Sequence, residues 1–119
     1  MGRQQLYLVL VEVTSLPLLV AVAVLVVSGY ILRYPGYAPL LSYGLLSYGD
    51  AAYLHAAPLI RISFTLLALL HSLGGLGLLI TRCVKGLRAR LVLEVLSAAG
   101  LTALFTPPLL LDAVALLSP

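Results

Sequence analysis

The stretch that decides the fold runs from Phe64 to Ile80 and reads Phe-Thr-Leu-Leu-Ala-Leu-Leu-His-Ser-Leu-Gly-Gly-Leu-Gly-Leu-Leu-Ile, with His71 near its middle. It contains no charged side chain, and a segment this apolar predicts a membrane-spanning helix. An imidazole within hydrocarbon is costly unless it has a partner, such as an ion, a proton path, a hydrogen-bond acceptor or a metal. His71 is therefore the first candidate functional residue.

The composition of the whole chain also predicts a membrane environment. Its 119 residues are 62% hydrophobic and 9% charged, with a mean hydropathy of +1.15, whereas a soluble domain carries roughly 25% charged residues. The first apolar segment is too long for the core of a cleavable signal peptide, and no small-residue cleavage pattern follows it. Cys83 is the single cysteine, so an intrachain disulfide and a cysteine-based metal site are excluded.

Three apolar segments are long enough to span a membrane, since a spanning helix needs roughly 20 residues. They run from about residue 6 to 32, 57 to 81 and 91 to 117. The sequence therefore predicts an all-α integral membrane protein with three transmembrane helices. We expect a single multi-pass domain over residues 1–119 that packs into a multi-subunit helix bundle in the cell membrane.

Positive charge in the short connecting segments predicts the orientation, because lysine and arginine gather on the cytoplasmic side. Most of the net charge of +3 comes from the segment 82–90 between the second and third spans, with Arg3 on the same side. We expect the amino terminus and this basic loop to be cytoplasmic. The charge thus indicates topology and not a surface for nucleic acid.

The segment 33–56 between the first two spans is rich in tyrosine and contains a tandem Leu-Leu-Ser-Tyr-Gly repeat at 40–44 and 45–49. Tyrosine favours the headgroup level of a membrane, where its ring is buried and its hydroxyl is hydrated. We expect an interfacial loop on the outer side, in preference to a ligand site.

Small residues share a helical face with His71. Residues three or four positions away lie on the same side of a helix, and around His71 these include Ala68, Gly74 and Gly75. Such a face leaves a shallow groove in which a flat macrocycle can approach the backbone, so haem iron is the favoured partner for the imidazole. The alternative is that both glycines only let another helix pack closely. Close packing alone, however, gives no reason to choose histidine.

A haem held by two imidazoles needs a second histidine, and His55 is the one other histidine in the chain. Along a continuous helix, His55 and His71 would be roughly 24 Å apart and would point in nearly opposite directions. They cannot hold the same iron, so the second ligand must come from another chain, either a copy of this one or a different subunit. His55 itself is a second haem ligand, a quinone hydrogen-bond partner or a plain interfacial residue.

Several ionisable residues within the spans are further candidates. Glu12 and Glu94 lie near the cytoplasmic boundary, where they either deliver protons to a quinone or pair with the basic loop; pairing is the favoured interpretation. Arg82 lies roughly 16 Å from His71 along a helix and nearly on its face. An arginine there can pair with a haem propionate, and Arg61 is a similar candidate on the outer side.

The stretch from Phe64 to His71, followed by Gly75 and the segment 81–91, resembles a known family. It is similar to the small cytochrome b-type membrane-anchor subunit of succinate dehydrogenase or fumarate reductase, over residues 64–93. In that family a histidine of the second span is followed four residues later by glycine. A short polar loop with an Asp-Tyr pair and a third helix come next. This chain has Arg82-Cys83 in place of Asp-Tyr.

The resemblance implies a definite function. Two small subunits would hold one haem b between them, with His71 as the axial ligand from this chain. Electrons from cytoplasmic flavin and iron–sulfur subunits would reach a membrane quinone near the cytoplasmic face. The tyrosine of the Asp-Tyr pair contacts the quinone in the family, and Cys83 is a poor substitute donor, so a quinone site would use other groups or lie on the partner. The chain would not be catalytic alone.

A second resemblance supports a different redox protein. Small cytochromes b of hydrogenase or formate dehydrogenase type often carry a Ser/Thr-Gly pair late in the first span and two histidines around the next one. Ser28-Gly29, Leu54-His55 and His71 fit that outline, which implies a haem near each membrane face. The remaining alternative is a cofactor-free structural subunit of a respiratory complex, in which His71 forms a hydrogen bond across a helix interface.

Overall fold

The computed structural model describes residues 2–118, and within them the chain is about 90% helical and contains no strand. Its elements, in chain order, are α1 (Arg3–Arg33), η1 (Pro35–Tyr37), α2 (Ala38–Ser42), α3 (Tyr48–Ala56), α4 (Pro58–Cys83) and α5 (Leu87–Leu117). The helices α1, α4 and α5 are long and apolar enough to cross a membrane. The prediction of an all-α chain with three helices of membrane-spanning length is confirmed.

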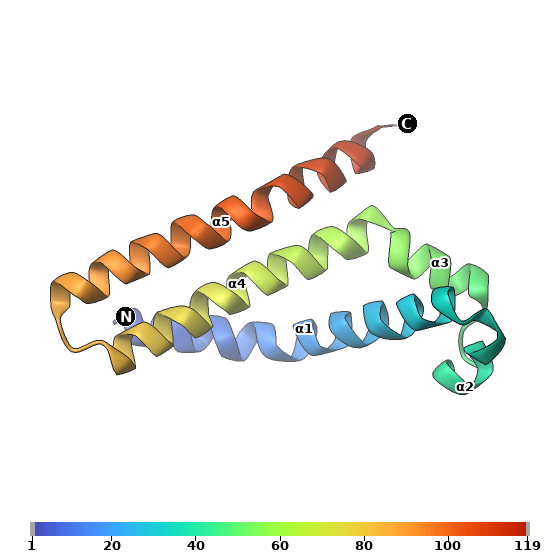
Figure 1. Ribbon diagram of the computed structural model, residues 1–119, viewed down its shortest axis with the longest axis horizontal. Coiled ribbons are helices and arrows are strands. Elements are labelled where there is room, and N and C mark those ends of the chain that lie inside the picture. Colours follow the sequence, from blue (N-terminus) through green and yellow to red (C-terminus); the bar gives the residue numbers. More distant parts are fainter. Residues whose placement is uncertain (1, 119) are drawn as a thin grey trace.

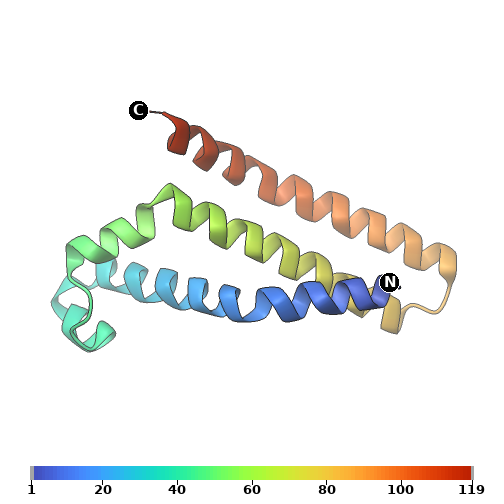
Figure 2. The ribbon, with the colours of Figure 1, turned by 180° about the vertical axis from the view of Figure 1, so that it is seen from behind.

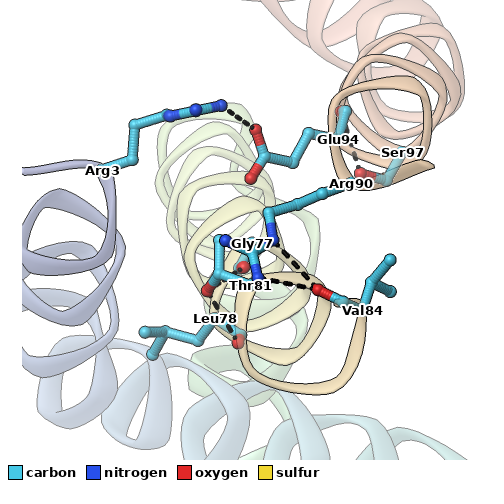
Figure 3. Close-up of polar contacts among 8 residues, drawn as sticks. All are labelled: Arg3, Gly77, Leu78, Thr81, Val84, Arg90, Glu94 and Ser97. Atoms are coloured by element: carbon cyan, nitrogen blue, oxygen red, sulfur yellow. Dashed lines mark hydrogen bonds and ion pairs between the residues drawn. The ribbon is translucent and has the colours of Figure 1, made fainter. Parts of the chain in front are cut away.

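The long helices extend beyond the apolar segments that predicted them. The connection between α4 and α5 is only residues 84–86, so Arg88 and Arg90 of the expected basic loop lie in the first turns of α5. Arg90 donates two hydrogen bonds to the carbonyl oxygen of Val84, at 2.7 and 3.1 Å (Figure 3). This contact satisfies a backbone acceptor between the helices and fixes the tight connection.

α4 contacts both α1 and α5, and the amino-terminal part of α1 crosses α4, behind it in Figure 1 and in front of it in Figure 2. α4 runs antiparallel to both α1 and α5 (Figure 1). Most large apolar side chains of these helices are exposed, and the buried hydrophobic residues Ile31, Ala38 and Ala51 gather at the end that carries α2 and α3. Apolar helices this exposed need lipid or further helices to cover them.

Glycines set the distance between α1 and α4. A Cβ atom on Gly74 would lie 2.9 Å from the carbonyl oxygen of Tyr7, and one on Gly77 would lie 2.6 Å from the Tyr7 ring. The hydroxyl of Thr81 donates back to the carbonyl of Gly77 at 2.9 Å (Figure 3), so this buried hydroxyl is paired. Small residues of this kind let membrane helices approach closely.

Two ion pairs attach α5 near its two ends. Arg3 of α1 pairs with Glu94 at 2.9 Å (Figure 3), and Arg61 of α4 pairs with Asp112. Both carboxylates are nearly buried, with about a tenth of each side chain exposed (10% and 12%). Glu94 thus pairs with Arg3 at the amino end of α1 and not with an arginine of the basic loop.

The tyrosine-rich segment, expected to be an interfacial loop, contains the short helices η1, α2 and α3. Ser47 begins α3 as its N-cap: the Asp50 backbone N–H donates to the Ser47 hydroxyl oxygen at 3.1 Å, and the Ser47 N–H donates to the Asp50 carboxylate at 2.9 Å. This reciprocal pair is a capping box. Tyr43 and Gly44, which belong to the first repeat unit, have positive φ angles of 53° and 77° and turn the chain between α2 and α3.

We predict that Gly74→Ala lowers the free energy of unfolding by about 1–3 kcal/mol, because the added methyl group meets the backbone of α1. Gly75→Ala is the matched control, since a Cβ atom there meets no heavy atom within 4 Å. The control should be neutral or gain up to about 1 kcal/mol from helix propensity. Unfolding in a detergent titration measures both, and equal effects would contradict the interface.

We predict that the capping box of α3 responds to acid. Hydrogen bonds from the Ser47 hydroxyl, and then from its backbone N–H, hold the pKa of the Asp50 carboxyl below its ordinary value. Because the folded pKa is lowered, the stabilisation is complete above the unfolded pKa and is lost as pH falls through the folded one. An NMR titration should show a lowered Asp50 pKa that rises in Ser47→Ala; an unchanged pKa in that variant would exclude the contact.

Candidate functional site

His71 of α4 is half-buried and forms a hydrogen bond across the interface with α1. Its Nδ1 lies 3.0 Å from the hydroxyl oxygen of Thr14, a residue with only 3% of its surface exposed. The Thr14 hydroxyl in turn lies 2.5 Å from the carbonyl oxygen of Leu10. A hydroxyl has one hydrogen to donate, and a carbonyl cannot donate. Thr14 therefore donates to Leu10 and accepts from the Nδ1–H of His71.

This chain of hydrogen bonds assigns the tautomer of His71. With the proton on Nδ1, the lone pair of the imidazole is on Nε2. Within residues 2–118, Nε2 forms no hydrogen bond, and it is not among the buried polar atoms that lack a partner. The nitrogen is therefore accessible from outside the chain. A histidine held through Nδ1 with Nε2 free is the arrangement of a metal-ligating imidazole.

His71 opens into a groove along the seam of α1 and α4. A hollow of about 380 Å³ lies beside the imidazole and is lined by Ser15, Leu18, Leu19, Val22 and His71. A second hollow, of about 190 Å³, lies nearer the amino terminus and is lined by Gln4, Gln5, Leu8, Leu78 and Arg82. We call the two together the α1–α4 groove.

The spacing of the α4 residues shows that the two hollows belong to one face. His71, Gly75, Leu78 and Arg82 follow one another at intervals of four, three and four residues, which keeps them on the same side of a helix. Gly75, between the hollows, has open space where a side chain would be. Gly75 therefore places no side chain between the two hollows, and Leu78 and Arg82 line the smaller one.

The two candidate glycines have different positions. Gly74 is buried against the α1 backbone, as described above, and contributes to helix packing. Gly75 faces the open groove. We expected both glycines to flank a groove, but Gly74 does not. Together with Thr81 it lies on the face of α4 that α1 covers. Gly75 remains the candidate for close approach of a flat ligand.

His55 is held in the same way as His71, but at the other end of α1. It lies on α3, and its Nδ1 is 3.1 Å from the Ser28 hydroxyl oxygen and 3.2 Å from the carbonyl oxygen of Leu25. A carbonyl can only accept, so Nδ1 carries the proton and Nε2 again has the lone pair. The ring packs on Gly29, whose added Cβ would lie 3.1 Å from the His55 Cε1 atom.

A hollow on α1 includes Gly29, which packs against the His55 ring, although His55 is not among the lining residues. The hollow measures about 420 Å³ and is lined by Leu25, Val26, Gly29, Tyr30, Arg33 and Tyr34. The Arg33 guanidinium lies over the Tyr34 ring, 5.6 Å from its centre. Arg33 thus lines this hollow, as Arg82 lines the smaller hollow of the α1–α4 groove.

The two histidines do not meet. They contact Thr14 and Ser28, which are 14 residues apart on α1, or roughly 21 Å along a helix. His55 is also separated from α4 by the break at Ala57, whereas the sequence estimate used one continuous helix. The separation is similar, and a single iron cannot bind both imidazoles.

The remaining candidate residues divide into paired and exposed groups. Arg61 and Glu94 are engaged in the ion pairs that hold α5. Glu12, Arg82 and Cys83 are exposed, with Cys83 as the last residue of α4. Glu12 forms no ion pair or hydrogen bond with another described residue, and it does not reach the basic connection.

The residues that sequence reasoning missed are Thr14 and, in its contact with His55, Ser28. Both are hydroxyl residues inside an apolar span, and this is the signal that could have identified them. Hydroxyl side chains in membrane helices usually bond to the carbonyl four residues earlier, so the sequence alone does not show that a histidine shares the contact.

In comparisons with models of protein families, characterised proteins and solved structures, none matches this chain. The functional proposal therefore rests on the geometry of the chain itself.

Proposed function

We propose that this chain is a membrane-anchor subunit of a quinone-linked respiratory oxidoreductase. His71 supplies one axial ligand to a b-type haem that is shared with a partner chain. The observation that supports the proposal most directly is the tautomer of His71: Thr14 holds Nδ1–H at 3.0 Å, and the basic Nε2 is open to the α1–α4 groove.

The residues of the groove fit a haem in three respects. An imidazole with a free Nε2 is a normal haem ligand, and the bond from its other nitrogen to a hydroxyl fixes the ring orientation. Gly75 leaves space for a flat group close to the helix. Arg82 is exposed in the same groove, roughly 16 Å along α4 from His71, and can pair with a carboxylate of the macrocycle. The haem itself would supply one-electron transfer.

The orientation and the partners complete the proposal. We infer that the end with the amino terminus and the 84–86 connection is cytoplasmic. Flavin and iron–sulfur subunits would dock there, and the chain would pass electrons to or from membrane quinone. Glu12 and Cys83 are exposed near that end and remain proton or quinone candidates. Glu94 is less available because it is paired with Arg3.

A structural role for His71 is the competing explanation. The bond to Thr14 crosses a helix interface, as a purely structural histidine would require. That role, however, leaves Nε2 without a partner in a largely apolar hollow, and polar groups in hydrocarbon are costly when unpaired. The free Nε2 therefore favours a ligand over packing alone.

A second candidate function is a small cytochrome b with two haems. The observation that favours it is the repeated arrangement of an α1 hydroxyl, a histidine Nδ1 and a free Nε2 at Ser28 and His55. Gly29 leaves room for the His55 ring, and Arg33 lines the adjoining hollow. A second haem there would lie near the opposite membrane face from Arg82.

We predict that His71→Ala abolishes the reduced α band of a b haem in the complex purified from membranes.

Thr14→Val should weaken haem retention about 10–100-fold, because it removes the acceptor that orients the imidazole. Thr65→Val is the matched control, since the Thr65 hydroxyl bonds only to the Arg61 carbonyl of its own helix. A b-haem band that survives His71→Ala would exclude His71 as the ligand, and an intact complex without haem would support the structural role.

Replacement of His55 separates the one-haem function from the two-haem function. If His55 binds a second haem, His55→Ala removes one of two redox transitions and halves the haem content, while His71→Ala removes the other. If His55 has no ligand, a potentiometric titration shows one transition in both the native protein and His55→Ala. Ser28→Ala should shift or weaken the same transition as His55→Ala.

A further inference from the structure

Three charged side chains of the long helices, those of Glu12, Arg82 and Arg88, form no ion pair or hydrogen bond within residues 2–118, and Arg33 only lies over the Tyr34 ring. Arg3, Arg61, Glu94 and Asp112 are paired inside the chain. Glu12 and Arg82 are exposed, whereas Arg88 lies in the first turn of α5 and lines neither hollow of the α1–α4 groove. Glu12 follows Arg3, the first residue of α1, by nine residues, roughly 14 Å along the helix. A carboxylate at that depth in an apolar span calls for a cation from outside the chain.

Glu12 and Arg82 are the two of these that lie next to the α1–α4 groove. Arg82 lines its smaller hollow directly. On α1, the groove residues Leu8 and Ser15 lie four residues before and three residues after Glu12, so Glu12 is their neighbour on the helix surface. The acidic residue thus lies on the α1 side of the groove, and the basic residue lies on the α4 side.

We propose that the α1–α4 groove docks against the same groove of a second copy of this chain, with Glu12 of each copy paired to Arg82 of the other. A two-fold axis along the groove places α4 of one copy against α1 of the other. In such an interface residue i contacts residue j of the second copy, and j contacts i. One acid and one base on opposite sides of the groove satisfy that rule, and the charges of Glu12 and Arg82 are then neutralised.

The depths of the two side chains permit the contact. Arg82 shares its hollow with Gln5, which is seven residues, or roughly 10 Å, nearer the amino end of α1 than Glu12. Side chains on a helix lean toward its amino terminus. Since α1 and α4 are antiparallel, Glu12 leans toward the level of Arg82, and Arg82 leans toward the level of Glu12. The long arginine side chain then covers the remaining distance.

The same two-fold axis brings the two His71 side chains to equal depth on facing grooves. This part of the inference rests on the proposed function, and it identifies the partner that supplies the second axial ligand as a second copy of the chain. It predicts one haem for every two chains. Gly75 of each copy leaves space next to the imidazole.

The test uses two differently tagged copies of the full chain, produced together and purified in detergent. The native copies should co-purify. Glu12→Arg and Arg82→Glu should each weaken co-purification at least about tenfold, a loss of about 1.4 kcal/mol or more. The double variant Glu12→Arg/Arg82→Glu should restore it, because the swapped charges attract again. Lys85→Glu is the matched control: it makes the same charge change in the connection outside the groove, and should have no effect.

Two outcomes would overturn the inference. One is that the native copies do not co-purify. The other is that both single variants weaken association and the double variant fails to restore it, although it is inserted and helical by circular dichroism. Haem content is measured separately: a dimer without haem supports the interface and refutes the proposed function, whereas haem bound with a different polypeptide supports that function and refutes the second copy.

Discussion

The close contact of α4 with α1 at Gly74 is the constraint on which the rest of the structure depends. A side chain at that position would meet the carbonyl of Tyr7 at 2.9 Å, so the two helices could not approach as they do. The contact places His71, nearly one turn before Gly74 on α4, opposite Thr14 on α1. A wider separation of the two helices would lengthen and then break this bond, which now measures 3.0 Å. Packing and candidate chemistry therefore share one interface.

The charged side chains of the long helices differ in whether they are paired within the chain. The pair Arg3–Glu94 joins α1 to α5, and the pair Arg61–Asp112 joins α4 to α5. They hold α5 against α1 and α4 with little help from buried apolar side chains. Pairs of a nearly buried carboxylate with a half-exposed arginine position helices more than they add net stability. Glu12 and Arg82, by contrast, border the open groove. The carboxylates that hold α5 are thus neutralised within the chain, whereas Glu12 and Arg82 beside the candidate interface are not.

Sequence reasoning predicted the helical class and three helices of membrane-spanning length, because uninterrupted apolar runs have few other solutions. It did not predict the capped helix α3, since the Ser47–Asp50 pair is a short local signal inside a tyrosine-rich segment that was expected to be a loop. It also could not distinguish Gly74 from Gly75. Adjacent residues on a helix differ by about 100° in direction, and only the position of α1 decides which one is covered. The hydroxyl partners of both histidines were missed for the same reason.

Two hydroxyl residues of the apolar helix α1 determine which nitrogen of each histidine carries the proton. Thr14 and Ser28 each direct a hydroxyl hydrogen toward a carbonyl of their own helix, so their oxygens can only accept from an imidazole. The proton of each histidine is thereby held on Nδ1, and each Nε2 keeps its lone pair. This assignment does not depend on any ligand, because it follows from hydrogen bonds within the chain. A group that donates to, or coordinates, Nε2 would find both imidazoles already in the required tautomer, so little reorganisation would be needed on binding.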